Sequence, residues 1–128
     1  MRPMNELSPE QVDRVITLAM DMAREGQTAQ LLEFLDHGLD IDVRDTDGNT
    51  LLMLAAYHGH GETVRELIGR GANVDLRNER DQSPVAGALF KGEDEVVKDL
   101  IAAGADLDAG TPSARATAQM FDRTELLP

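Results

Sequence analysis

The sequence contains no cysteine and no tryptophan, and only four of its 128 residues are aromatic. Without cysteine the chain can form no disulfide and has no thiol for catalysis or metal binding, which is compatible with a reducing compartment. With so few aromatic residues, a hydrophobic core has to be built from Leu, Val, Ile, Ala and Met. These features favour a small-residue core and exclude a disulfide-stabilised scaffold.

Basic residues are also scarce, at twelve against 24 acidic residues, which gives a formal net charge of −12. Such a charge repels nucleic-acid phosphates and anionic lipid at long range, so we expect neither as a partner. The longest uninterrupted apolar run, residues 51–57, is far too short to span a bilayer, and the N-terminus has no signal-peptide hydrophobic region. We therefore expect a cytoplasmic protein.

What the sequence does contain is an internal repeat with a period of 33 residues. When residues 45–77 are shifted forward by 33, nine positions coincide. The identical pairs are Ala55/Ala88, Gly59/Gly92, Glu62/Glu95, Val64/Val97, Leu67/Leu100, Ile68/Ile101, Gly71/Gly104, Ala72/Ala105 and Asp75/Asp108. Weaker echoes precede residue 45, so the chain is an array of units that bury their apolar faces on one another.

Each unit has the pattern of two short helices followed by a turn. Residues 51–58 are a short apolar run that ends at Gly59, where the backbone can adopt a positive φ. In residues 62–70 the apolar residues are three and four apart, as on one face of a helix, and Gly71 follows. Turn-forming Asp, Asn and Gly residues come next, so a projecting loop is predicted to join one helix pair to the next.

The residues that carry this pattern resemble an ankyrin repeat. They are Gly48-Asn49-Thr50-Leu51-Leu52, Leu54-Ala55-Ala56, Gly59-His60, Val64, Leu67-Ile68 and Gly71-Ala72-Asn73. The family pattern Thr-Pro-Leu-His at the start of the first helix is replaced here by Thr-Leu-Leu-Met at residues 50–53 and by Ser-Pro-Val-Ala at residues 83–86. Gly87 lies inside the first helix of the next repeat, where glycine costs about 1 kcal/mol relative to alanine, so we expect that helix to be the weakest.

The resemblance implies an all-α ankyrin-repeat solenoid of stacked helix-turn-helix units with projecting β-turn loops and capping helices at both ends. We expect one domain over residues 1–128. Its parts are an N-terminal cap and first repeat over about 7–44, repeats over 45–77 and 78–110, and a truncated C-terminal cap over 111–128.

The two ends of the array have their own signals. Ser8 can cap a helix, Pro9 suits its first position, and Gln11 completes a capping box. This first helix is predicted to be about twice as long as its counterparts and to end at Gly26, with a second helix over about 28–36. At the other end, a helix over 113–121 begins about five residues earlier than strict repetition predicts.

One loop imitates part of a calcium site. Asp45, Asp47 and Gly48 match three positions of the calcium-binding loop of EF-hand proteins, but this alignment puts Val43 at its first position and Leu54 at its last, where Asp and Glu are needed. A turn explains these residues better.

Other candidates for chemistry have ordinary structural explanations. His58 and His60 flank Gly59 and lack further ligands nearby in the sequence, so we interpret them as solvated or groove-lining residues. The serines stand at helix starts and suit capping, and no GxxxxGK phosphate loop occurs. We therefore predict no catalytic residue, no metal ligand and no cofactor, and we do not expect an enzyme.

In the ankyrin family, partners are usually bound by the loop tips and the exposed side of the first helices. Transferred residue by residue, this implies a binding groove made of Arg44, Thr46, Asp47, Asn49, Tyr57, His58, Arg77, Glu79, Arg80, Gln82, Phe90 and Lys91. Tyr57 and Phe90 stand one repeat apart, and four of the twelve basic residues belong to this set. Aromatic and arginine side chains are common in binding hot spots.

We predict a non-catalytic protein–protein interaction module that binds another protein with an acidic or mixed-charge surface. The short, Ala-rich, cysteine-free chain resembles free-standing bacterial ankyrin repeat proteins. A monomer is favoured, and the main alternative is a structural protein that self-assembles through its caps or an exposed edge. A metal-binding protein or an enzyme is the least favoured alternative. The competing interpretation of Tyr57 and Phe90 is that they only cover neighbouring helices.

Overall fold

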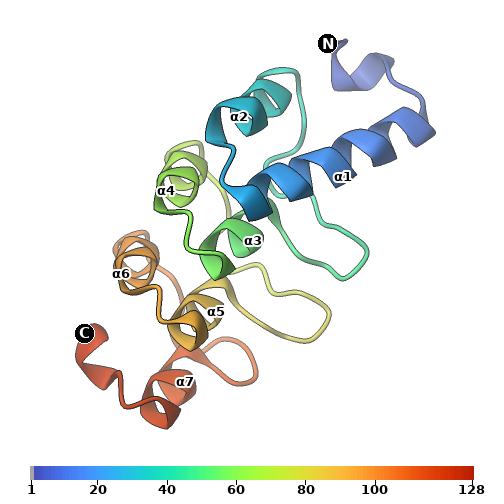
Figure 1. Cartoon of the computed structure of the whole chain (residues 1–128). Coiled ribbons are helices and arrows are strands. Elements are labelled where there is room, and N and C mark those ends of the chain that lie inside the picture. Colours follow the sequence, from blue (N-terminus) through green and yellow to red (C-terminus); the bar gives the residue numbers. More distant parts are fainter. Residues whose placement is uncertain (1) are drawn as a thin grey trace.

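A computed structural model of the chain describes residues 2–128 and shows an elongated stack of helices (Figure 1). Seven α-helices and two short 3-10 helices are present in this range, and no strand. In chain order they are η1 (Met4–Glu6), α1 (Pro9–Glu25), α2 (Thr28–Asp36), α3 (Leu51–Tyr57), α4 (Gly61–Gly69), α5 (Pro84–Lys91), α6 (Asp94–Ala102), α7 (Ala114–Met120) and η2 (Thr124–Leu126).

The helices form two rows. Helices α1, α3, α5 and α7 make an inner row in which each packs on the next, and α2, α4 and α6 make an outer row (Figure 1). The loops that join an outer helix to the following inner helix project to the side of the inner row (Figure 1). In the first of these loops Arg44 and Thr50 form a β-bridge across the turn, so the predicted projecting loops are confirmed.

The predicted start and end of the first helix are both observed. The amide of Gln11 donates to the hydroxyl of Ser8 at 3.2 Å, and the amide of Ser8 donates to the side chain of Gln11 at 2.9 Å, which completes the capping box. Gly26 ends the helix with a φ of 72°, in the left-handed region. Helix α1 has 17 residues against seven in α3, which confirms its greater length.

The later inner helices begin at equivalent N-cap residues. Thr50, Ser83 and Ser113 each accept a hydrogen bond from the backbone amide three residues further on. Because Thr50 and Ser83 are 33 positions apart and Ser113 follows Ser83 by 30, the last loop is three residues shorter than the others. The predicted shortening by about five residues was therefore wrong in size, since it was judged from Pro112 and not from the N-cap.

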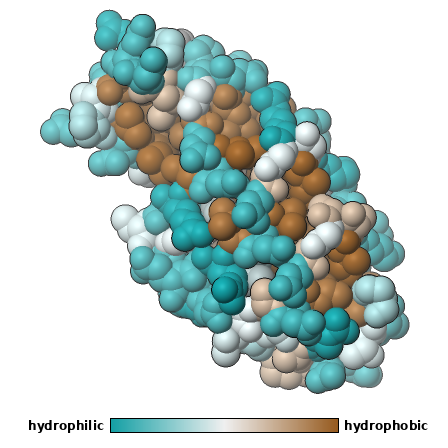
Figure 2. All heavy atoms as spheres, turned by 180° about the vertical axis from the view of Figure 1, so that it is seen from behind, coloured by the Kyte–Doolittle hydropathy of each residue, from teal (hydrophilic) through white to brown (hydrophobic). Residues whose placement is uncertain are grey.

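The core lies between the two rows and consists of small and aliphatic residues, as predicted. Ala55, Leu67, Val97 and Leu100 are completely buried, and Met20 is almost so. Seen from behind, the stack shows hydrophobic surface only as separate patches that hydrophilic residues divide (Figure 2). Along residues 2–128, no helix has the combined length and apolar character needed to cross a membrane.

Polar contacts also repeat from one unit to the next. The side chain of Asp42 accepts the backbone N–H of Asn73 at 2.9 Å, and the side chain of Asp75 accepts that of Asp106 at 2.7 Å. Ion pairs connect neighbouring outer helices in the same way, Arg70 with Asp36 at 2.7 Å and Arg65 with Asp99 at 3.4 Å. Each unit therefore holds its neighbour by directional contacts as well as by apolar burial.

Candidate functional site

The inner side of the stack contains two hollows. The first, of about 510 Å³, lies between α1 and the first projecting loop. It is lined by Asp13, Ile16, Thr17, Met20, Arg24, Arg44, Asp45, Thr46 and Asp47. The structure thus brings three predicted groove residues, Arg44, Thr46 and Asp47, against the side of α1.

Charged side chains of both signs surround this first hollow, and an internal network holds several of them. Arg24 pairs with Asp21 at 3.0 Å and lies 3.7 Å from Asp45. Asp45 also accepts the backbone N–H groups of Asp47 and Asn49, each at 2.9 Å. The loop is therefore held in one conformation by its own aspartate, which supports the interpretation of this segment as a turn.

The second hollow, of about 450 Å³, lies toward the other end of the stack, where α5 stands between α3 and α7. It is lined by Met53, Tyr57, Gln82, Ser83, Ala86, Gly87, Phe90, Pro112, Thr117, Met120 and Phe121. No charged residue is among them. This hollow is therefore apolar, in contrast to the first.

Small residues on α5 keep the second hollow open. Gly87 is part of its lining, and a methyl group added there would meet only the Tyr57 ring, at 3.4 Å. Met53 and Ala86 stand where the ankyrin pattern has histidine, so no imidazole enters the hollow from either position. The departures from the family pattern thus make this hollow both larger and less polar.

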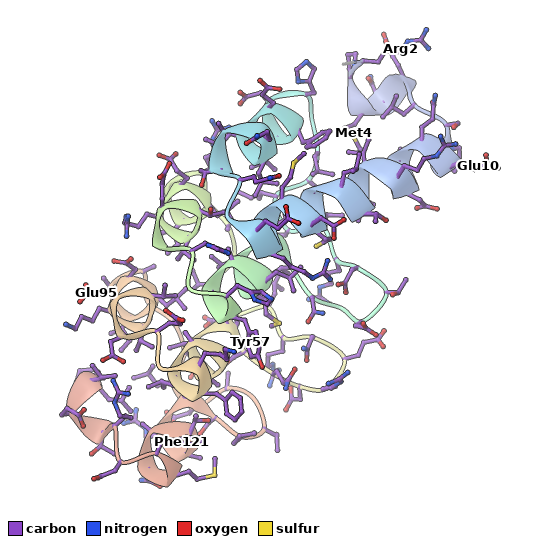
Figure 3. All side chains as sticks on the ribbon, viewed as in Figure 1. Arg2, Met4, Glu10, Tyr57, Glu95 and Phe121 are labelled. Atoms are coloured by element: carbon purple, nitrogen blue, oxygen red, sulfur yellow. The ribbon has the colours of Figure 1, made fainter. Side chains whose placement is uncertain are left out.

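Large hydrophobic side chains are exposed around the second hollow. Tyr57 is 36% exposed, Phe90 57%, Phe121 48% and Met120 63%, and all four line it. The only other large hydrophobic residue exposed within residues 2–128 is Leu18, on α1. The rings of Phe90 and Phe121 pack edge to face with centroids 5.6 Å apart, and Figure 3 shows Tyr57 at the end of α3 and Phe121 at the end of α7. The exposed apolar surface is therefore concentrated at one place.

Cationic and imidazole groups lie beside this apolar surface. The ammonium of Lys91 lies 5.1 Å from the centroid of the Tyr57 ring, and the His58 ring meets the same ring edge-on at 5.4 Å. Partial burial lowers the pKa of His58, and the positive charges of His60, Lys91 and Arg24 lower it further. We call His58, Lys91 and Arg24, which stand at the ends of α3, α5 and α1, the cationic ridge.

The remaining predicted groove residues lie on the projecting loops. Arg77 pairs with Asp81 at 3.1 Å, and the backbone of Glu79 donates to the carbonyl of Asp47 at 3.0 Å. Arg80 is exposed, and Gln82 lines the second hollow. The side chain of Asn49 accepts a hydrogen bond from Asn78 at 2.9 Å, which links the first two loops. Whether these residues bind a partner stays a prediction.

Two residues of the second hollow, Met120 and Phe121, were not predicted. Counting from the N-cap, Met120 is the seventh residue after Ser113, as Phe90 is after Ser83 and Tyr57 after Thr50. Alignment of the N-caps would have revealed this equivalence, whereas a strict period of 33 residues does not.

The prediction that the serines serve as helix caps is confirmed for Ser8, Ser83 and Ser113, whose hydroxyls all accept backbone amides. Within residues 2–128 there is no group of three or more His, Asp or Glu side chains that could hold a metal ion.

Comparison with known proteins agrees with the repeat structure. A family model described as ankyrin repeats, in three copies, matches residues 19–111. The chain is also 42% identical over 57 residues to a Pseudomonas aeruginosa protein that bears the name "Putative ankyrin repeat protein PA3287". That match covers 44% of this chain and only 33% of the relative. Because the family model spans well over half of the sequence, and the helix pairs stack as the family requires, this chain belongs to the ankyrin-repeat family.

Proposed function

We propose that this ankyrin repeat protein binds a segment of another protein along the inner side of its stack, without catalysis. Ankyrin repeats are generally protein–protein interaction modules and typically not enzymes. The observation that carries the proposal is the second hollow, where four of the five exposed large hydrophobic side chains gather. Exposed apolar groups that surround a hollow are typical of binding sites, because burying them on a partner is favourable.

The two hollows suit different parts of such a partner. The second hollow can bury an apolar side chain between the rings of Tyr57 and Phe90, and aromatic residues in such places dominate binding energy. The first hollow presents carboxylates and the Arg44 guanidinium, and so suits polar groups of a partner with mixed charge. The structure supports the use of both aromatic residues as more than covers for neighbouring helices, since Phe90 is more than half exposed.

Affinity capture with matched variants tests this proposal. Phe90→Ala with Met120→Ala removes the two most exposed side chains of the second hollow, while Leu18→Ala removes a side chain of similar exposure that lines neither hollow. All three proteins are first compared by circular dichroism and urea unfolding. We expect wild type and Leu18→Ala to capture the same protein from lysate of the source organism, and the double variant to lose it. Equal capture by all three would refute binding at the second hollow.

Self-association is the second candidate, because two copies could also cover this apolar surface. The net charge of −12 on each copy opposes it at long range. Sedimentation of wild type and of the Phe90→Ala, Met120→Ala variant over a range of concentrations separates the two functions. A mass above 13.9 kDa that grows with concentration, and that the double variant lacks, would favour self-association.

A further inference from the structure

We propose that the second hollow and Lys91 together recognise a partner segment in which a large apolar side chain stands next to an acidic residue. The apolar side chain fills the hollow, and the carboxylate meets the Lys91 ammonium at its edge. This inference rests on the proposed function and adds the chemistry of the bound segment.

The first argument is the uneven pairing of the cations. Of the twelve basic side chains, all within residues 2–128, seven lie within 4.0 Å of a carboxylate; the other five are Arg2, Arg14, Arg44, Arg80 and Lys91. Three of those five belong to the predicted groove. In a chain with two acidic residues for every basic one, cations without an internal partner are expected to be uncommon. Their presence on the inner side favours an anionic group on the partner.

The second argument is the position of Lys91. It follows Phe90, which lines the hollow, and its ammonium lies 5.1 Å from the centroid of the Tyr57 ring. The ring holds the cation at the edge of the apolar surface by a cation–π contact. This contact uses none of the three N–H donors of the ammonium, which stay open to an acceptor. A carboxylate bound there would lie close to a side chain that fills the hollow.

The third argument is the charge around this position. The lowered pKa of His58 reflects, besides burial, the positive charges of His60, Lys91 and Arg24. The nearest acidic candidate on the ridge, Glu93, packs its carboxyl against Gly59 and lies beyond ion-pair distance of Lys91. A negatively charged group of the partner would therefore relieve a local excess of positive charge.

The overall charge of −12 does not oppose this local recognition in physiological salt. The Debye length there is about 8 Å, so exposed carboxylates farther away are largely screened at Lys91. A carboxylate in contact with the ammonium is not screened to the same degree. The bound segment is thus expected to carry one or two acidic residues and not a long acidic run, which the whole protein would repel.

Selection from a random library of 12-residue peptides tests the inference. The full chain is the bait, and a Gly87→Leu chain, in which the new side chain fills the hollow, removes peptides that bind elsewhere. Peptides that bind only wild type are expected to share a large apolar residue next to Asp or Glu. Replacing that acidic residue with its amide should weaken binding about three- to fivefold, the size of one exposed ion pair.

A double-mutant cycle assigns the effect to Lys91. On a Lys91→Gln chain the acidic peptide and its amide form should bind equally, while on Lys98→Gln the difference should persist. Lys98 is a matched control because it pairs with Glu95 on α6, in the outer row, where Figure 3 shows Glu95. Circular dichroism and urea unfolding confirm that each variant folds.

The outcomes separate this inference from the proposed function. Hollow-dependent peptides without an acidic residue, or an equal loss on Lys91→Gln and Lys98→Gln, would overturn the inference and leave the hollow as a protein-binding site. If no peptide distinguishes wild type from Gly87→Leu, the proposed use of the hollow also fails. A wild-type dimer that dissociates in Gly87→Leu would make a second copy the occupant and overturn the acidic-segment proposal.

Discussion

Replacing Gly87 with alanine probes the structural role of the small residue that lines the second hollow. Glycine in a helix interior costs about 1 kcal/mol relative to alanine, and Gly87 has no positive φ that would require it. The new Cβ would lie 3.4 Å from the Tyr57 ring, an ordinary van der Waals contact, and would meet nothing else within 4 Å. We therefore expect the free energy of unfolding to rise by about 0.5–1 kcal/mol, which corresponds to about 3 °C in Tm.

Urea unfolding followed by circular dichroism measures this change, and Gly92→Ala is the matched comparison. Gly92 ends the same helix with a φ of 74°, and the nearest atom to an added Cβ is 4.0 Å away. Alanine there carries only the cost of a left-handed backbone, about 1–2 kcal/mol, so the same substitution should destabilise. A Gly87→Ala protein that is no more stable than wild type would refute the reasoning, because it would show that the Tyr57 ring needs the space.

Three further changes test contacts within the stack by the same unfolding assay. Thr63→Val removes the buried partner of the Thr28 hydroxyl, 2.6 Å away, and should cost about 1–2 kcal/mol, whereas the double change to valine should cost less; equal losses would argue against the hydrogen bond. Asp75→Ala should cost about 0.5–1.5 kcal/mol by removing the acceptor of a neighbouring repeat's amide, and Asp75→Asn should retain most of it; equal effects would show that the charge matters more than the acceptor. Because the pKa of His58 is lowered on folding, protonation favours the unfolded chain as pH falls below about 6.5, so stability should decline more between pH 7.5 and 5.5 in wild type than in His58→Gln.

The helices could be predicted because their ends carry local chemistry. Ser8 with Gln11 specifies a capping box from residues three apart, and Gly26 and Gly71 mark helix ends by their need for positive φ. None of these signals depends on contacts distant in the sequence. The predicted second helix of the first repeat, over 28–36, accordingly has the observed bounds of α2.

The site was predictable only in part, because it depends on how the units are placed against one another. Tyr57 and Phe90 repeat at the period of 33 residues, whereas Met120 comes three residues early after a shorter loop and so lost its equivalence. The part of α1 that faces the first loop was interpreted as a cap, and its Asp13 and Thr17 line the first hollow. Whether a side chain borders a hollow depends on the neighbouring helix, which local patterns do not report.

The second hollow is shared by three successive inner helices, and this affects cooperativity. In a repeat array each unit is coupled mainly to its immediate neighbours, so the free chain can unfold in stages. A segment seated between α3, α5 and α7 would add a connection across two repeat interfaces at once. Its binding free energy would then count against any partial unfolding of these repeats. The bound array should unfold as fewer, larger cooperative units, and its unfolding midpoint should rise with ligand concentration.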